Sequence, residues 1–350
     1  MNETTDETAA APAELSAKRE RELIEQLRSL RRQIDDELSK VIIGQKDVVE
    51  QLLIALLSGG NCLITGAPGL AKTLLVKSIA ELFDLKFNRI QFTPDLMPAD
   101  ITGTEVLEED HAGHRAMRFI PGPIFANVLL ADEINRTPPK TQSALLEAMQ
   151  EHQVTAAGTR YELEEPFFVL ATQNPIEMEG TYPLPEAQLD RFMFNVLIDY
   201  LPEDEEVAVV QQTTSKRAHR IQSLFEGAVV GEFHQVVQRV PIAEEVVRYA
   251  VRLAAASRPG QKDAPGFVND LVSWGAGLRA GQYLVLGGKA AALLDGRPYV
   301  SAKDIQRLAK PVMRHRILPN YRAEAEGVTT EIIIDRLLKS VAHPKQEAVA

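Results

Sequence analysis

The sequence predicts an α/β fold in which a mostly parallel, doubly wound sheet is followed by an α-helical domain. Between residues 41 and 201, short apolar runs alternate with segments of helical periodicity, as expected for strands and helices wound around a parallel sheet. From residue 202 to about residue 345 the periodicity is mainly helical. A glycine-rich turn also joins the first apolar run to the helix that follows it, which is the setting of a phosphate-binding loop.

The N-terminal region divides into a tail and a helix. Residues 1–17 are small, polar and acidic, and we expect them to be disordered. Residues 18–40 are expected to be helical, with an apolar stripe too short for a coiled-coil partner site. We therefore expect this helix to pack on the domain behind it. The stripe consists of Leu23, Leu27, Leu30, Ile34 and Leu38.

Five apolar runs are the expected strands of the sheet, because each is short and bounded by turn residues or by helical segments. A helical pattern over residues 71–83 connects the first strand to the second. The expected strands are 61–65, 87–92, 128–131, 167–171 and 194–198.

Composition excludes several classes of protein. The 350 residues are 45% hydrophobic and 25% charged, which predicts a folded, soluble chain. The 49 acidic residues exceed the 38 basic ones, so a broadly basic nucleic-acid surface is not expected. Cys62 is the single cysteine, which excludes an intrachain disulfide and a thiolate zinc site. With no apolar run of 18 residues and an acidic start unlike a secretory signal, the expected location is the cytoplasm.

The segment Gly66–Thr73 carries the strongest chemical signal. It follows an expected strand and opens an expected helix, so its backbone N–H groups would cradle the β-phosphate of a nucleotide. Lys72 would add a positive charge to the β- and γ-phosphates, and the Thr73 hydroxyl would ligate magnesium. Ala71 stands where the general pattern has glycine, and an alanine fits there if this residue already has helical geometry.

Two further strands end in polar residues. Asp132 and Glu133 follow the apolar run 128–131, at the strand end where open α/β sheets bind ligands. Asp132 would hold the magnesium ion, and Glu133 would orient and deprotonate the attacking water. Asn174 follows the run 167–171 and could hydrogen-bond the γ-phosphate or that water.

These motifs, in this order, resemble the AAA+ ATPases and, more narrowly, the MoxR family. The resemblance covers roughly residues 41–343, and an alanine before the loop lysine is usual in that family. The stretches that carry it are Val41-Ile-Ile-Gly-Gln45, Gly66-Ala-Pro-Gly-Leu-Ala-Lys-Thr73, Gln91-Phe-Thr-Pro-Asp-Leu-Met-Pro-Ala-Asp100, Asp132-Glu-Ile-Asn-Arg-Thr-Pro-Pro-Lys-Thr-Gln142 and Leu184-Pro-Glu-Ala-Gln-Leu-Asp-Arg-Phe192.

The resemblance implies a nucleotide site that extends beyond the phosphate loop, because residues 42–44 match the segment that packs against adenine. The expected cofactors are ATP and Mg²⁺. The residues expected to contact the nucleotide are Ile42, Ile43, Gly44, Gly66, Ala67, Pro68, Gly69, Leu70, Ala71, Lys72, Thr73 and Leu74.

The resemblance also implies three catalytic positions. Asn174 matches the sensor 1 position, and Arg191 matches the arginine finger that reaches a neighbouring subunit's γ-phosphate. A surface ion pair of Arg191 with Asp190 or another acid is the alternative. Arg279 matches the sensor 2 arginine of the lid, although this chain lacks the serine and proline that usually precede it in the family.

Two inserts fit the same family. Residues from about 97 to 123 match a helix-2 insert that carries a β-hairpin, and residues 153–163 match a hairpin ahead of sensor 1. The second also has the sequence pattern of a hairpin, with two β-prone runs around a turn that contains glycine. In a ring both would face the pore or the top surface, or they would only cap sheet edges. Trp274 is expected in the core of the lid.

The resemblance implies a Mg²⁺-dependent ATPase that works as a homo-oligomeric ring, most simply a hexamer. A chaperone-like role is implied, in which hydrolysis remodels or matures a partner protein, with von Willebrand factor A domains as expected clients. A metal-chelatase motor subunit and a DNA-directed motor are the alternatives, and a catalytically dead scaffold is disfavoured. No nucleic-acid partner is expected.

Overall fold

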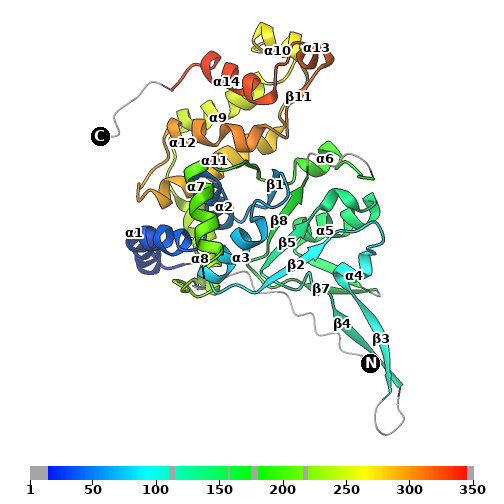
Figure 1. Cartoon of the computed structure of the whole chain (residues 1–350). Helices are drawn as coiled ribbons and strands as arrows, with labels where there is room; N and C mark the ends of the chain where they lie inside the picture. The colour runs from blue at the N-terminus through cyan, green and yellow to red at the C-terminus, as the bar shows by residue number, and fades with distance from the viewer. Residues whose placement is uncertain (1–14, 110–114, 157, 175–179, 216–219, 345–350) are drawn as a thin grey trace, which may run out of the picture.

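The computed structural model describes residues 15–109, 115–156, 158–174, 180–215 and 220–344. The tail that we expect to be disordered lies almost entirely outside these residues. A five-stranded sheet stands at the centre of the fold, with the helical lid on one side and a long hairpin projecting away from it (Figure 1).

The sheet has the strand order β2-β5-β8-β1-β9, and every neighbouring pair is parallel. Of the four pairs of sheet strands that are consecutive in the chain, β2–β5 and β5–β8 are neighbours, whereas β1–β2 and β8–β9 are not. Parallel neighbours require crossover connections between them. The predicted doubly wound parallel sheet is confirmed. Its strands are β1 (Cys62–Gly66), β2 (Phe87–Gln91), β5 (Val128–Asp132), β8 (Phe168–Gln173) and β9 (Phe194–Ile198).

Alternate side chains of each central strand enter two different hydrophobic cores. On β5, Val128 and Leu130 share a core with α2 and α3, whereas Leu129 and Ala131 share a core with α5. All four side chains have no exposed surface, so both faces of the sheet are covered. The covering helices are α2 (Lys46–Ser58), α3 (Lys72–Leu82) and α5 (Pro139–Glu151).

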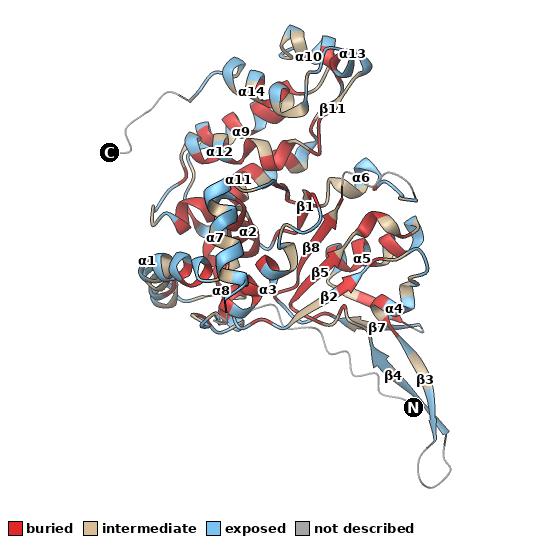
Figure 2. Ribbon diagram, in the orientation of Figure 1, coloured by how far each residue is buried: buried red, intermediate tan, exposed pale blue. Residues whose placement is uncertain are grey.

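Two antiparallel hairpins lie where the sequence predicts inserts. The longer one, β3–β4, projects from the body and is largely exposed, whereas β6–β7 is shorter (Figure 2). The rings of Phe119 on β4 and Tyr161 on β7 stack with centroids 4.0 Å apart, so the base of the long hairpin rests on the short one. The elements are α4 (Pro98–Thr102), β3 (Gly103–Glu109), β4 (Arg115–Pro121), β6 (Gln153–Ala156) and β7 (Thr159–Glu162).

The C-terminal half is mainly helical, as predicted, and forms the lid. Two short strands, β10 and β11, pair antiparallel within it. Its elements, with the short helix α6 that precedes β9, are α6 (Glu186–Leu189), α7 (Glu203–Thr213), α8 (Ala228–Arg239), α9 (Glu244–Ala256), α10 (Gly266–Leu271), β10 (Val272–Trp274), α11 (Leu278–Leu294), α12 (Ala302–Met313), β11 (Leu318–Pro319), α13 (Tyr321–Ala325) and α14 (Thr330–Ser340). The short 3₁₀ helix η1 (Ile134–Arg136) follows β5 in the sheet domain.

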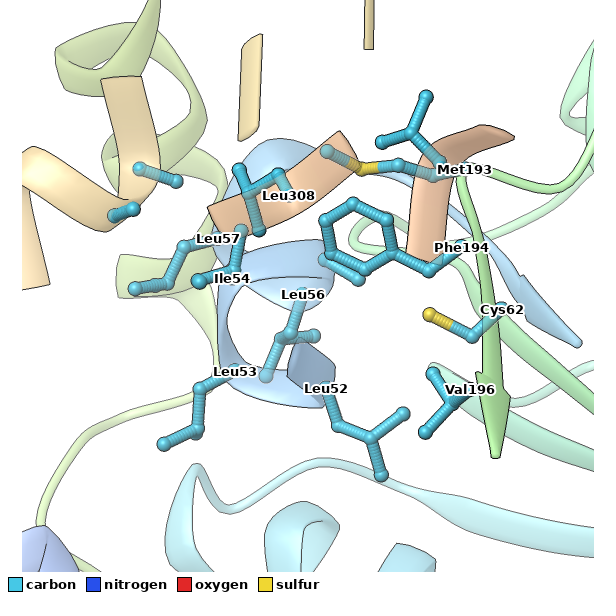
Figure 3. Close-up of a cluster of buried hydrophobic side chains, with 14 of the residues drawn as sticks. Leu52, Leu53, Ile54, Leu56, Leu57, Cys62, Met193, Phe194, Val196 and Leu308 are labelled. Carbon is cyan, nitrogen blue, oxygen red and sulfur yellow. The ribbon is translucent and has the colours of Figure 1, made fainter. Parts of the chain in front are cut away.

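The lid shares one hydrophobic core with the sheet domain. Leu308 of α12 and Phe194 of β9 lie beside the leucines of α2 (Figure 3). Gly287 allows α11 to approach this point, since a Cβ there would meet Leu308 at 2.9 Å and Met193 at 3.0 Å. The lid is therefore joined to β9 by close packing as well as by the chain itself.

The N-terminal helix α1 (Ala17–Ser39) packs against α3, α8 and α11. Leu23, Leu27 and Ile34 of its apolar stripe have no exposed surface, so the stripe faces the body of the molecule. None of the helices within the described ranges combines the length and apolarity that crossing a membrane requires.

One core prediction is wrong. Trp274 is 67% exposed, because it lies at the end of the two-stranded β10–β11 ribbon on the outside of the lid. By contrast, Cys62 is fully buried in β1 as expected, and burial raises the pKa of its thiol far above the usual range.

Packing of α1 on the body gives a stability prediction. Replacing Leu27 by alanine should lower the free energy of unfolding by about 2–5 kcal/mol, because the side chain is fully buried between helices. Urea denaturation followed by circular dichroism measures this. Glu25→Ala on the exposed face of the same helix is the control, and an equal effect of both changes would contradict the packing.

Candidate functional site

Three polar strand ends meet at one edge of the sheet. Because β8 lies between β1 and β5, the phosphate loop after β1, Asn174 after β8 and Asp132 at the end of β5 all emerge at the carboxyl edge. Thr65 of β1 is level with Gln173 of β8, so the ends of these strands coincide. This edge is where open α/β sheets bind their ligands (Figure 1).

The phosphate loop has the backbone of an anion-binding cradle. Gly69 has φ +83°, and a Cβ placed on it would meet no atom within 4 Å, so this part of the loop is open. Helix α3 begins directly after the loop, and no side chain caps its N-terminus. The first N–H groups of α3 are thus available to phosphate oxygens, which fits a nucleotide.

Ala71 corrects one sequence argument. It has φ 56° and ψ 25°, a left-handed conformation rather than the helical one that we expected for an alanine at this position. Such a conformation costs a residue with a Cβ about 1–2 kcal/mol. The loop therefore keeps the geometry that glycine usually provides, at a small cost in stability.

Lys72 lies at the first position of α3 and is half-buried. Its ammonium donates a hydrogen bond to the carbonyl oxygen of Gly66, at the other end of the loop. Burial lowers the pKa of Lys72, while the nearby carboxylates of Asp132 and Glu133 act in the opposite direction. The ammonium thus lies between the loop and the two acids, where it can contact bound phosphates.

A buried hydroxyl links the two acids. Thr172 of β8 donates to Oδ1 of Asp132 at 2.6 Å and accepts from the backbone N–H of Glu133 at 2.8 Å. Thr172 is only 1% exposed, so water does not replace these bonds. Glu133 also has φ 58°, a left-handed conformation. The hydroxyl therefore fixes both the metal-ligand candidate and the backbone of the base candidate.

Strand β2 supplies polar partners to the same two acids. Arg89 donates to Oδ2 of Asp132 at 2.6 and 3.1 Å, and Gln91 donates to Oε2 of Glu133 at 2.7 Å. Arg89 also donates to Oε1 of Gln91, which joins the two contacts into one network. Arg136 forms an ion pair with Glu133 at 3.1 Å. Neighbouring side chains therefore orient both carboxyl groups.

A pocket of about 280 Å³ continues from the phosphate loop toward the segment expected to contact adenine. Ile42 and Ile43 line it together with Leu74 of α3 and with Val209 and Val210 of α7. A mostly apolar pocket beside a phosphate cradle fits a purine nucleotide, because the flat faces of the base are apolar while the phosphates are charged.

Gly44 lies next to this pocket in a backbone conformation that favours glycine. It has φ +67°, and a Cβ would overlap the carboxylate of Glu205 on α7 at 2.0 Å. The expected adenine segment, the phosphate loop and α7 thus form one continuous surface.

The two candidate arginines lie away from the phosphate loop. Arg191 donates to the carbonyl oxygen of Leu146 on α5, which covers the sheet face opposite to α3. Arg279, at the start of α11, forms an ion pair with Asp190 at 3.4 Å. The structure therefore brings Arg191 and Arg279 near each other through Asp190, and the ion pair that we considered between Arg191 and Asp190 is replaced by one from Arg279.

Comparisons with known proteins give the family. Residues 61–194 match the model of an ATPase family associated with various cellular activities, and residues 268–337 match an AAA lid domain. The chain is 40% identical to Chaperone MoxR1 of Mycobacterium tuberculosis, over 89% of this chain and 82% of that one. This chain belongs to the MoxR family of AAA+ ATPases.

Two further comparisons agree with this family assignment. Protein MoxR of Methylorubrum extorquens is 29% identical over 85% of this chain and 90% of its own length. A crystal structure of a protein from Cytophaga hutchinsonii, described as a proposed ATPase, superposes with a TM-score of 0.86 at 42% identity and covers 94% of this chain and 99% of that one.

Sequence reasoning missed the residues that hold the acids of this MoxR-family ATPase. Thr172, Arg89 and Gln91 each lie on a strand beside β5. Gln91 opens one of the stretches that resemble the family, but the sequence assigns a role to none of the three. Only their position could have identified them, because a polar side chain near the carboxyl end of a strand that neighbours β5 faces the site. Recognising that position requires the strand order, which the sequence alone does not provide.

Thr172→Val tests the buried link between the two acids. Valine keeps the shape but leaves Asp132 and the Glu133 N–H without their partner, so the free energy of unfolding should fall by about 1–3 kcal/mol. Chemical denaturation without nucleotide measures it. Thr172→Ser keeps the hydroxyl and serves as the control, and a serine variant as unstable as the valine variant would contradict the role of the hydroxyl.

Proposed function

We propose that this MoxR-family ATPase hydrolyses ATP with Mg²⁺ at the carboxyl edge of the sheet. Lys72 and the N–H groups of the loop bind the phosphates, and Glu133 orients the attacking water and accepts its proton. Asn174, at the end of β8, hydrogen-bonds the γ-phosphate or that water. The observation that carries this proposal is the convergence of the loop after β1 with Asp132 and Glu133 after β5, on either side of β8, whose Thr172 bonds to both acids.

Thr73 and Asp132 would hold the magnesium ion. The described residues contain no group of three or more His, Cys, Asp or Glu side chains placed to hold a metal by themselves. Two oxygen ligands from the protein, completed by phosphate oxygens and water, suit Mg²⁺, which keeps several waters in proteins. Bound Mg²⁺ would neutralise charge on the β- and γ-phosphates.

Arg191 would complete a neighbouring subunit's site rather than its own. Its guanidinium contacts α5, on the sheet face opposite to the helix that begins at the phosphate loop. This direction supports an arginine finger that acts in trans, and an arginine finger typically raises the rate by about 10³–10⁵. We therefore propose a homo-oligomeric ring, most simply a hexamer, with Arg279 of the lid as a second arginine at the shared site.

The long hairpin supports a chaperone role with a protein client. Leu107 on β3 and Met117 on β4 lie directly opposite each other and are each 60% exposed, which suits an apolar protein surface. The described part of the hairpin carries three acids and two arginines, so it lacks the basic surface that a DNA-directed motor needs.

Family resemblance suggests proteins with a von Willebrand factor A domain as the first clients to test. The relative in M. tuberculosis carries the name of a chaperone, which supports remodelling of a partner protein over the metal-chelatase alternative.

If each active site is shared between two subunits, two inactive variants should complement each other when they are mixed. Glu133→Gln should abolish hydrolysis in its own subunit but leave Arg191 intact, whereas Arg191→Ala should leave its own Glu133 intact. Mixed rings pair an intact Glu133 with an intact Arg191 at some interfaces, so an equimolar mixture should recover part of the wild-type rate. Phosphate release measured across a range of protein concentrations checks this.

The wild-type rate per subunit should rise with concentration in the same assay as rings assemble. Glu133→Gln mixed with Glu133→Gln/Arg191→Ala is the control, because no interface then contains an intact base. A flat rate per subunit and a mixture that only averages its components would contradict the ring.

A further inference from the structure

Three consecutive residues of the lid form hydrogen bonds with the segment that carries Arg191. Arg314, His315 and Arg316 directly follow α12, and each donates hydrogen bonds to backbone oxygens between residues 190 and 195. Arg314 reaches the carbonyl oxygen of Asn195 at 2.9 Å, and His315 lies 3.1 Å from that of Phe192. The segment that enters β9 is thus bonded to the lid along its length.

Arg316 makes most of these bonds. Its guanidinium donates to a carboxylate oxygen of Asp190 at 2.7 Å and to the backbone oxygens of Asp190 at 2.7 Å, Phe192 at 2.6 Å and Met193 at 3.3 Å. The side chain is 1% exposed. A planar guanidinium with several donors can bind all these oxygens at once, which a lysine ammonium cannot do.

Helix α11 also binds this segment. Tyr283 donates from its hydroxyl to the backbone oxygen of Arg191 at 3.2 Å, and its ring lies under the guanidinium of Arg316 at 5.1 Å. Arg279, at the start of α11, pairs with the other carboxylate oxygen of Asp190. Residues on both sides of Arg191, and the backbone of Arg191 itself, are therefore fixed to the lid of the same subunit.

We infer that Arg316 is a positioning residue for Arg191, which ties the arginine finger of each subunit to that subunit's own lid. This inference rests on the proposed function, in which Arg191 acts on the neighbouring subunit. A change in the position of the lid then moves Arg191 with it, so the lid of one subunit sets the rate at the site of the next. A shift of about 1 Å at a reacting centre can cost on the order of 10²-fold in rate.

Mixed rings separate this role from a merely structural one. The Glu133→Gln subunit is the finger donor, and the Arg191→Ala subunit provides the working site. We measure the recovered rate of the mixture with Arg316→Lys placed in one subunit or in the other. We expect this rate to be lower by about tenfold or more when the change is in the finger donor than when it is in the working subunit. A general defect of the lid would lower the rate in both placements alike.

Two further variants keep the test decisive. Tyr283→Phe removes only the hydroxyl that bonds to Arg191 and should show the same asymmetry at smaller size, even if Arg316→Lys fails to fold. Arg297→Lys changes another arginine of the lid, one that pairs with Asp304 and not with residues 190–195, and should show no asymmetry. Binding of a fluorescent ATP analogue to each variant confirms that the nucleotide site is intact.

The outcomes are distinct. If the unmodified mixture of Glu133→Gln and Arg191→Ala recovers no activity, the proposed action in trans is wrong. If that mixture recovers activity but the placement of Arg316→Lys and of Tyr283→Phe makes no difference, Arg316 does not position the finger and the inference is overturned.

Discussion

The position of β8 between β1 and β5 is the constraint on which the rest of the site depends. It brings the phosphate loop and the acids of β5 to one edge and places the Thr172 hydroxyl between Asp132 and Glu133. Because alternate side chains enter two different cores, a one-residue slip of a strand would move each of its side chains into the wrong core. The strand order of the sheet therefore determines both the stability of the core and the geometry of the site.

The lid belongs to the same physical unit. It shares a hydrophobic core with β9 through Gly287 and Leu308, and buried Arg316 binds the segment that enters β9. A guanidinium with so little exposure needs charged and polar partners, and the segment that carries Arg191 provides most of them. Packing at this junction consequently determines where Arg191, the proposed arginine finger, lies.

Local patterns in the sequence were sufficient for the strands, the phosphate loop and the acids of β5, because each depends on neighbours in the chain. The residues that support them depend on partners far away: Arg89 meets Asp132 only because β2 pairs with β5. Arg316 meets Asp190 across 126 positions. Trp274 was misplaced because a large aromatic side chain usually predicts a core, whereas here it ends an exposed ribbon.

Binding of ATP to wild-type protein and to Lys72→Ala, measured by titration calorimetry with Mg²⁺, tests the central claim that the loop and strand ends form a nucleotide site. We predict saturable binding to the wild type and affinity weaker by roughly tenfold to a hundredfold for the variant, because Lys72 supplies a charged donor to the phosphates. Arg115→Ala on the hairpin is the control and should bind like the wild type. Equal affinity of Lys72→Ala and the wild type would contradict the account.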